Sequence, residues 1–365
     1  MVTQQRRRAE IGIVAGYVLR LARESIPLTQ EAATQDLEVD LGTVQGWESG
    51  RRPLSNVRAG ALLDLRRRLA ALGADQRLLA LLEPAMDADR ILTAALRPAA
   101  SPADHPLAHW VQNREAATML AWALRGITPP AVPALPVRRR RGPVPAGPVL
   151  AAPDRDAFFS HLRVTVESAQ IAGERAFLLR RQALYLASYD PRDDAQDWAA
   201  DAMRGMRSSL SVRGFGERWI EARTTATVAA RQGDPELLQD FIGNALANDD
   251  AGEFANLQYW AYWLGALPPD QPDDAFMRDS PGSTRWNPVE LLRLLTDGLH
   301  DAPGTVDLYV HSISALLTAH PWVALADPAL AIRVAHRTQR LLDGTIISPR
   351  SRQDLNKVQY RLKPN

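Results

Sequence analysis

The sequence predicts an all-α protein. Apolar residues recur three or four positions apart along nearly the whole chain, which is the spacing that gives a helix one buried face. Strict alternation of apolar and polar residues, which is typical of half-buried strands, is essentially absent. Glycine, proline and capping residues separate the apolar stretches at intervals that suit helices. Because 365 residues exceed the ~100 to 200 of a usual domain, we expect more than one domain.

The composition narrows the class of protein. With 46% hydrophobic and 23% charged residues, the chain lies in the ordinary globular range, which excludes wholesale disorder. It contains no cysteine, so disulfides, thiolate nucleophiles and cysteine-bound metals are impossible, and the cytoplasm is the expected location. The apolar run Ile11 to Leu19 follows three arginines, like a signal peptide, but Arg20 interrupts it. No stretch approaches the ~18 apolar residues of a membrane helix, so we expect no membrane partner.

Four helices are expected at the N-terminal end. The first carries apolar residues with 3, 4, 3 spacing at positions 11, 14, 18 and 21, and Pro27 closes it. The second covers 28–37. The third begins at the N-cap candidate Asp40 and ends before Gly50 and Pro53. A longer helix with a basic outer face is expected over 57–72.

The rest of the chain divides into three further parts. Helical stretches are expected at 75–82, 87–96 and 107–125, and eight prolines in 126–153 predict a semi-rigid linker. About ten helical segments in 154–365 indicate a helical-repeat, TPR-like domain. We therefore expect a compact bundle of helices at 1–72, a helical extension at 73–125, the linker at 126–153, and a dimerisation or sensor domain at 154–365.

Charge is distributed unevenly between these parts. Residues 1–68 carry 11 arginines against 8 acids, and the linker carries Arg138 to Arg141 with no acid. Residues 154–365 instead carry 23 basic against 28 acidic side chains. The excess of basic residues in the N-terminal part of the chain favours an anionic partner. For Arg138 to Arg141, a solvated spacer is the main interpretation and a secondary grip on DNA is the alternative.

One segment has specific spacing, 28-LTQEAATQDLEVDLGTVQGWESGRRPL-54. Two short helices joined by a tight turn form a helix-turn-helix, whose second helix fits the major groove of DNA. The segment resembles the Cro and phage-repressor type, the xenobiotic-response-element family, over about residues 8 to 72. The residues that match its pattern in register are Leu28, Thr29, Gln30, Leu37, Val39, Thr43, Val44, Trp47, Glu48 and Gly50.

The resemblance implies a role for each position of the motif. Gln30 would meet phosphate and an adjacent base edge, and Leu41, Gly42, Gln45 and Gly46 would face the groove. Thr43 and Ser49 would hold phosphates. Val44 and Trp47 would lie in the core, and Glu48 would pair with Arg23. Beyond the motif, Arg51 and Arg52 are expected to contact the DNA backbone or minor groove, with a solvated surface as the alternative.

Two departures from the family pattern matter. Glu38 occupies the turn position that usually holds glycine, so it must adopt a positive φ or a different turn. Leu41, Gly42 and Gly46 offer no side-chain hydrogen bonds, so direct readout depends on Gln45 and on contact between Leu41 and a thymine methyl. The alternative interpretation is a structural helical hairpin without DNA binding.

No motif of an enzyme or cofactor site is present, so we expect neither catalysis nor a cofactor. Only His105 and His109 have a metal-like i, i+4 spacing, and a surface or capping role is favoured for them. In the C-terminal part, Tyr259, Trp260, Tyr262 and Trp263 surround much of one helix. Packing between repeat layers is the main interpretation, and a ligand groove is the alternative, with Arg180, Arg181 and Arg204 as candidate anchors for an anion.

These observations lead to one functional expectation. We expect a DNA-binding transcriptional regulator that reads an inverted repeat of double-stranded DNA as a homodimer, with a C-terminal domain that dimerises or senses a small-molecule or peptide effector. The alternative is a protein-interaction scaffold that the helix-turn-helix tethers to DNA, as in plasmid, phage or defence systems.

Overall fold

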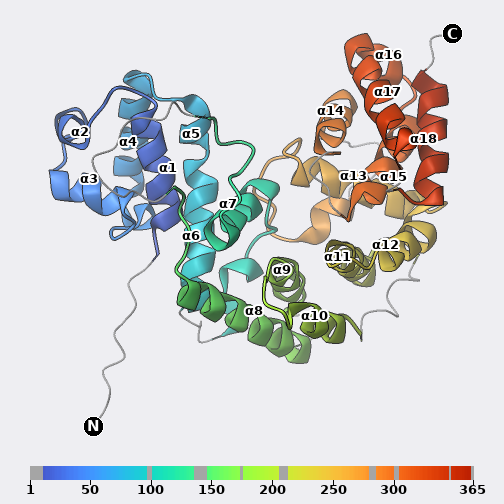
Figure 1. The fold of residues 1–365 in the computed structure, drawn as a ribbon, viewed down its shortest axis with the longest axis horizontal. Coiled ribbons are helices and arrows are strands. Elements are labelled where there is room, and N and C mark those ends of the chain that lie inside the picture. Colours follow the sequence, from blue (N-terminus) through green and yellow to red (C-terminus); the bar gives the residue numbers. More distant parts are fainter. Residues whose placement is uncertain are drawn as a thin grey trace. The chain divides into compact units, whose positions relative to one another are not determined.

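The computed structural model describes residues 11–96, 101–134, 146–172, 176–204, 213–278, 285–299, 304–344 and 347–362. The prediction of an all-α protein is confirmed, because every regular element in these residues is helical and none is a strand (Figure 1). Helices contact one another in two compact units, residues 1–165 (unit 1) and 166–365 (unit 2). In the described ranges, no helix is both long and apolar enough to cross a membrane.

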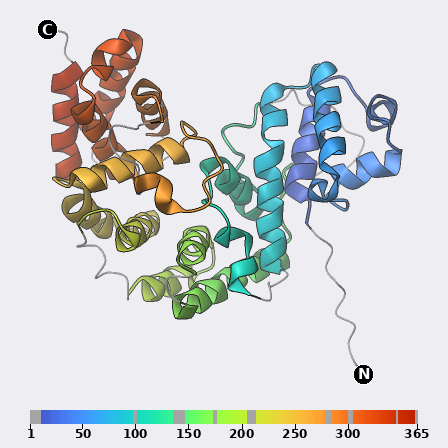
Figure 2. The same ribbon diagram turned by 180° about the vertical axis from the view of Figure 1, so that it is seen from behind.

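Unit 1 is built around α1 and α6. Both helices lie side by side in the two views (Figure 1, Figure 2), and α6 also packs against α7. The expected extension at 73–125 therefore shares a core with the N-terminal helices. The helices of unit 1 are α1 (Ile13–Glu24), α2 (Gln30–Leu37), α3 (Leu41–Glu48), α4 (Ala59–Ala71), α5 (Gln76–Ala80), α6 (Leu82–Leu96) and α7 (Arg114–Arg125).

An acidic side chain from α6 holds the start of α1. Asp89 is buried, and its two carboxylate oxygens accept hydrogen bonds from Val14 N at 3.0 Å and Ala15 N at 2.9 Å. These N–H groups have no acceptor within their own helix, so Asp89 caps α1 from a distance. Burial raises the pKa of Asp89 to about 7, although the two backbone hydrogen bonds act in the opposite direction.

Two expected helix starts differ from the structure by five residues or more. The helix expected at 87–96 begins five residues earlier, at Leu82, because Pro84 lies in its first turn, where a missing N–H costs nothing. The helix expected at 107–125 begins only at Arg114, where Asn113 accepts a hydrogen bond from Ala116 N. The preceding residues form the short 3-10 turn Pro106–Ala108 instead.

The described part of the expected linker is attached to unit 1 at its C-terminal end. Tyr17 Oη donates to Ala146 O at 2.8 Å, and Leu150 N donates to Ala123 O at 2.9 Å. The Leu150 side chain is buried. Arg138 to Arg141 lie outside the described residues.

Unit 2 begins within α8 and consists of successive helices in mutual contact. The red helices α17 and α18 lie side by side (Figure 2), and α15 packs against α18. Its core includes Trp219, Phe241 and Tyr262, each at most 1% exposed. The helices are α8 (Ala152–Ala172), α9 (Phe177–Ala187), α10 (Ala195–Arg204), α11 (Glu217–Arg231), α12 (Glu236–Phe241), α13 (Asp250–Trp263), α14 (Pro288–Gly298), α15 (Val306–Ala319), α16 (Val323–Ala326), α17 (Pro328–Asp343) and α18 (Pro349–Leu362).

Candidate nucleic-acid interface

The helices α2 and α3 each begin with a side-chain cap. Thr29 Oγ1 accepts from Ala32 N at 3.1 Å, and Asp40 Oδ1 accepts from Thr43 N at 2.8 Å. The expectation that Asp40 is the N-cap of the third helix is thus confirmed. Only residues 38–40 separate the two helices, so their relative direction is set by a short turn.

The turn forces a positive φ on a residue other than glycine. Glu38 has φ 54° and ψ 44°, the left-handed conformation that its place in the motif requires. Arg68 of α4 donates to Glu38 Oε2 at 2.7 Å and to Asp36 O at 3.0 Å. These bonds help to hold a conformation that costs ~1 to 2 kcal/mol for a residue with a side chain.

A buried ion pair connects α1 with the end of α3. Arg23 Nε donates to Glu48 Oε1 at 2.5 Å, and Arg23 Nη2 donates to Glu48 Oε2 at 2.9 Å. The expected pairing of these two side chains is present. Gln30 Nε2 also donates to Glu48 Oε2, at 2.6 Å, so the amide that was expected on phosphate and a base edge belongs to this network as well. Both oxygens of Glu48 are therefore engaged, by donors from α1 and α2.

A close approach of backbones fixes the distance between α1 and α3. A Cβ added to Gly16 would lie 2.2 Å from Trp47 O, so only glycine allows this contact. Gly50 has φ 74°, and a Cβ added to it would lie 2.7 Å from Gly12 C. Val44 is buried, as expected, but Trp47 is half-buried rather than fully in the core.

The outer face of α3 is open and carries no acidic side chain in its first turn. Gly42, Gln45 and Ser49 are exposed, and Leu41 and Thr43 are half-buried. Gly46, which was expected to face the groove of DNA, is buried instead. The cause is the side chain of Arg52, because a Cβ on Gly46 would lie within 2.9 to 3.0 Å of Arg52 Cδ and Cγ.

Arg52 lies along α3 rather than beyond it. Its backbone N donates to Gly46 O at 2.9 Å, and its Nη1 donates to Thr43 Oγ1 at 2.6 Å. Thr43 Oγ1 in turn donates to Asp40 Oδ2 at 2.6 Å, so this hydroxyl is already used. Arg52 itself is exposed, and it adds a guanidinium to a helix face that the sequence suggested was almost without donors. Arg51 is also exposed.

The aromatic helix of unit 2 divides its four rings between core and surface. Trp260 is 4% and Tyr262 1% exposed, so these two are core residues, whereas Tyr259 and Trp263 are half-buried. The three candidate anchor arginines each form an ion pair, Arg180 with Glu221, Arg181 with Asp274, and Arg204 with Asp201.

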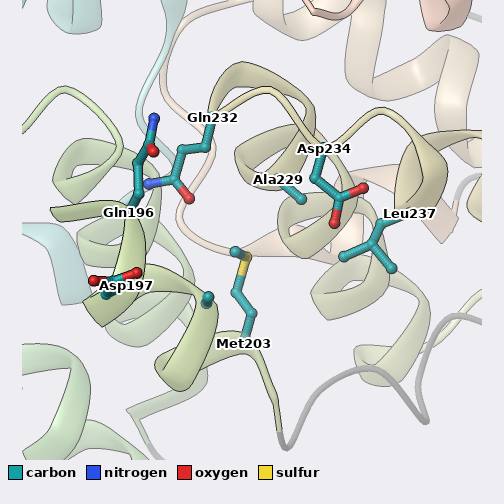
Figure 3. A pocket seen from close by; sticks show the side chains of 8 residues that line it. Gln196, Asp197, Met203, Ala229, Gln232, Asp234 and Leu237 are labelled. Atoms are coloured by element: carbon teal, nitrogen blue, oxygen red, sulfur yellow. The ribbon is translucent and has the colours of Figure 1, made fainter. Parts of the chain in front are cut away.

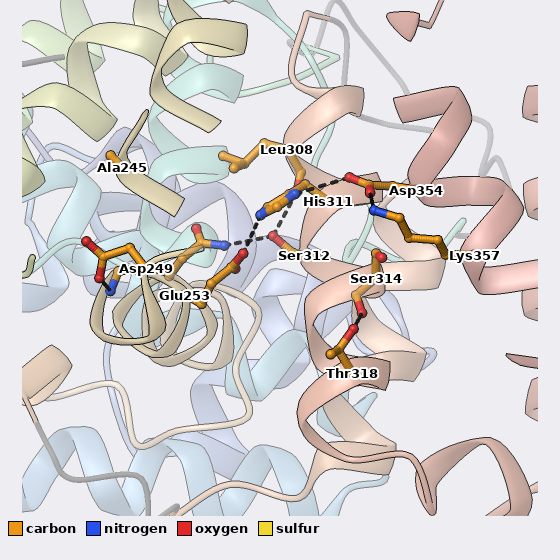
Figure 4. Close-up of polar contacts among 12 residues, drawn as sticks. Ala245, Asp249, Glu253, Leu308, His311, Ser312, Ser314, Thr318, Asp354 and Lys357 are labelled. Carbon is orange, nitrogen blue, oxygen red and sulfur yellow. Dashed lines mark hydrogen bonds and ion pairs between the residues drawn. The ribbon is translucent and has the colours of Figure 1, made fainter. Parts of the chain in front are cut away.

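Two other polar sites occur in unit 2. A cavity of about 210 Å³ between α10, α11 and α12 has polar and apolar walls, including Met203, Gln232 and Leu237 (Figure 3). His311 lies between two carboxylates, at 2.7 Å from Glu253 and 3.2 Å from Asp354 (Figure 4). Burial alone would lower the pKa of His311, but the bonds to Asp354 and Glu253 outweigh it and raise the pKa to about 9.

The histidines do not form a metal site in the described ranges, where no group of three metal-ligating side chains occurs. His105 is buried and its Nδ1 accepts from Leu107 N at 3.1 Å, so it caps the 3-10 turn Pro106–Ala108. Capping was one of the two roles favoured for it. Burial, with the neighbouring His161 and His109, lowers the pKa of His105 to about 4.

Sequence reasoning did not single out Asp89 or Arg223 of α11. It named Arg52 as a contact of the DNA backbone or minor groove, but not the bonds of Arg52 to Gly46 O and Thr43. Only the pair Gly46 and Arg52 left a local signal, a helical glycine six positions before an arginine. Comparison with family models, curated proteins and solved structures found no match.

Proposed function

We propose that the chain is a sequence-specific regulator of transcription that binds duplex DNA through α2 and α3, as a helix-turn-helix of the Cro and phage-repressor type. The observation that carries the proposal is the exposed face of α3, on which Gln45 and Arg52 lie, with the guanidinium of Arg52 held through Thr43 to the N-cap Asp40. The net charge of residues 1–68, 11 basic against 8 acidic, suits phosphate.

The rigidity of the α2–α3 pair supports this role. A recognition helix must keep its angle to the body of the domain, because base contacts depend on fractions of an ångström. Here the Arg23–Glu48 ion pair and the close approach at Gly16 fix α3 to α1. A purely structural hairpin needs neither an exposed amide nor an exposed guanidinium on its outer face.

The proposed readout of base sequence uses two side chains that prefer different bases. Gln45 pairs with adenine N6 and N7, and Arg52 pairs with guanine O6 and N7, each through two hydrogen bonds. Leu41 contacts a thymine methyl. Thr43 positions Arg52 rather than a phosphate, since its hydroxyl is bonded to Arg52 and Asp40. Ser49 and Arg51 remain the proposed phosphate contacts.

We further propose that two copies bind an inverted repeat, because one small module reads too few base pairs for useful selectivity. Unit 2, a stack of helices, would serve as a TPR-like dimerisation or effector domain. A scaffold that is merely tethered to DNA would share the interface but would not respond to an effector. DNA binding is thus common to both functions.

DNase protection tests the proposal. We expect the full chain to protect two half-sites, about 10 to 10.5 base pairs apart from centre to centre, upstream of its own gene. The variant Gln45→Ala should bind random duplex DNA as before but need a higher protein concentration to give the footprint, because it loses one base contact. Equal protection of all sequences by the unchanged chain would contradict the proposal.

A further inference from the structure

Three helices of unit 2 place arginine and aromatic side chains on one continuous surface. The residues of each helix are four or eight positions apart, so they share a face. We call this the arginine–aromatic surface, and its members are Tyr185 and Tyr189 from α9 and the residues after it, Arg223 and Arg231 from α11, and Tyr259 and Trp263 from α13.

The members are linked in sequence by direct contacts. The guanidinium of Arg223 lies 3.7 Å from the ring centre of Tyr259, which stacks on Trp263 with ring centres 6.1 Å apart. Trp263 meets Tyr185 edge-on at 5.5 Å. Arg231 closes the series, 4.8 Å from the ring of Tyr185 and 4.6 Å from that of Tyr189. The four aromatic rings are half-buried, so they keep an outer side.

The buried end of this surface has more positive than negative charge. Arg223 is only 6% exposed, yet its Nε donates a hydrogen bond to a neutral group, the amide oxygen of Asn256, at 3.2 Å. In the described part of unit 2, no carboxylate pairs with it. The nearby Arg181 is buried as well, and Asp274 is the partner of Arg181. Two buried guanidinium groups thus have one carboxylate.

This imbalance is physically costly. A buried charge without a counter-ion is destabilising, and contact with the faces of Tyr259 and Trp260 compensates only in part. Burial lowers the pKa of Arg223 to about 10. Arg231, at the exposed end, donates to Tyr189 Oη at 3.0 Å and likewise forms no ion pair in the described ranges. An anionic ligand would supply the counter-ion that the buried Arg223 lacks, and a second carboxylate would pair with Arg231 at the exposed end.

The spacing and the surrounding charge distinguish between anionic ligands. Eight residues of α11 separate the two arginines, which is about 12 Å along the helix axis. An extended peptide advances ~3.3 Å per residue, so two carboxylates about four positions apart span this distance. The aromatic rings between them suit an apolar side chain. A nucleic-acid backbone fits less well, since residues 166–365 carry 21 basic against 26 acidic side chains.

We propose that the arginine–aromatic surface binds an extended acidic peptide, with one carboxylate at Arg223, a second at Arg231, and an apolar side chain on Tyr259 and Trp263. This site lies in unit 2 and does not depend on DNA binding by unit 1. It assigns the half-buried rings of α13 to a ligand, while Trp260 and Tyr262 stay in the core.

The test uses the full chain and an array of 12-residue peptides. Each peptide carries two aspartates, one to eight positions apart, with leucine between them in an alanine background, and asparagine replaces aspartate in the controls. Binding should be strongest at a spacing of about four. Arg223→Gln should weaken it ~30-fold, and the exposed Arg231→Gln up to ~5-fold. Arg218→Gln, which removes an exposed arginine of the same helix, should leave binding unchanged.

A second measurement separates ligand binding from a structural role of Arg223. Removing an uncompensated buried cation is neutral or stabilising, so Arg223→Met should keep or raise the melting temperature while peptide binding is lost. A lower melting temperature would identify Arg223 as a structural residue and overturn the proposal. Absence of peptide binding, binding independent of spacing, or binding of a 12-nucleotide oligothymidylate in place of peptides would overturn it as well.

Discussion

At the scale of single residues, Gly46 and Arg52 define the proposed interface together. The glycine has no side chain, and the arginine covers it and reaches Thr43. The sequence shows both residues, but the position of Arg52 depends on a rotamer and a loop path that spacing alone does not specify. Gln45, in contrast, is exposed where helical periodicity places it.

Replacement of Gly46 should separate stability from DNA recognition. Gly46→Ala improves helix propensity and should stabilise α3 by up to ~1 kcal/mol. Its Cβ would also displace Arg52, so discrimination at one base pair should fall by ~1 to 3 kcal/mol. Denaturant unfolding and binding titrations on single-base variants of the DNA site measure the two effects. Gly60→Ala, in an open part of α4, is the matched control, expected to alter stability alone.

His311 should make unit 2 sensitive to alkaline pH. Its pKa is about 9 in the folded chain, against an ordinary value near 6.5, so its stabilising contribution is complete below about pH 6.5. This contribution should be lost as the pH rises from 6.5 to 9, by at most about 3 kcal/mol. Thermal unfolding of the full chain across this pH range measures it. His311→Gln should flatten the profile, whereas replacement of the exposed His336 by glutamine should not.

At the scale of elements, the sequence predicted those helix ends that depend on neighbouring residues only. Asp40 and the helix end before Gly50 could be read from the sequence, because a cap and a positive φ depend on a few neighbouring residues. The start of α6 could not, since Pro84 is compatible with either a break or a first turn. The cap of α1 was also beyond sequence reasoning, because Asp89 lies 75 positions from Val14.

The distant cap gives a prediction for α1. Asp89→Ala leaves two backbone N–H groups of α1 without an acceptor and should lower the free energy of unfolding of unit 1 by ~2 to 4 kcal/mol. Urea unfolding followed by tryptophan fluorescence measures the loss. Asp64→Ala removes an exposed carboxylate of α4 and should change stability by less than ~0.5 kcal/mol. Equal effects of the two variants would refute the capping role.

At the scale of the whole molecule, the helical class was predictable and the assembly of charge in unit 2 was not. Each helical segment has apolar residues three or four positions apart, so its class can be predicted from its own sequence. The pairing of Arg181 with Asp274, 93 positions away, decides which arginine lacks a counter-ion, and only the fold shows it. The domain boundaries expected at 72 and 125 stay predictions, although the helices on either side of residue 72 pack together in unit 1.

A fragment tests the division of labour between the two units. Residues 1–172 contain unit 1 and the whole of α8, and they keep the contacts of Ala146 and Leu150, which a cut at 125 would remove. We expect this fragment to keep the base preference of the full chain but to bind the DNA site at least ~10-fold more weakly, because a dimerising domain supplies a high effective concentration of the second half-site. Equal affinity and stoichiometry would show that unit 2 does not dimerise the protein.

Selection from a random duplex library is the most direct test of the central claim, that α3 reads base sequence. The full chain should enrich one inverted repeat, and Gln45→Ala and Arg52→Ala should each relax the preference at a different position of the half-site. Affinity for unselected DNA should change little in Gln45→Ala. Failure of the unchanged chain to enrich any sequence, with both variants indistinguishable from it, would contradict the account.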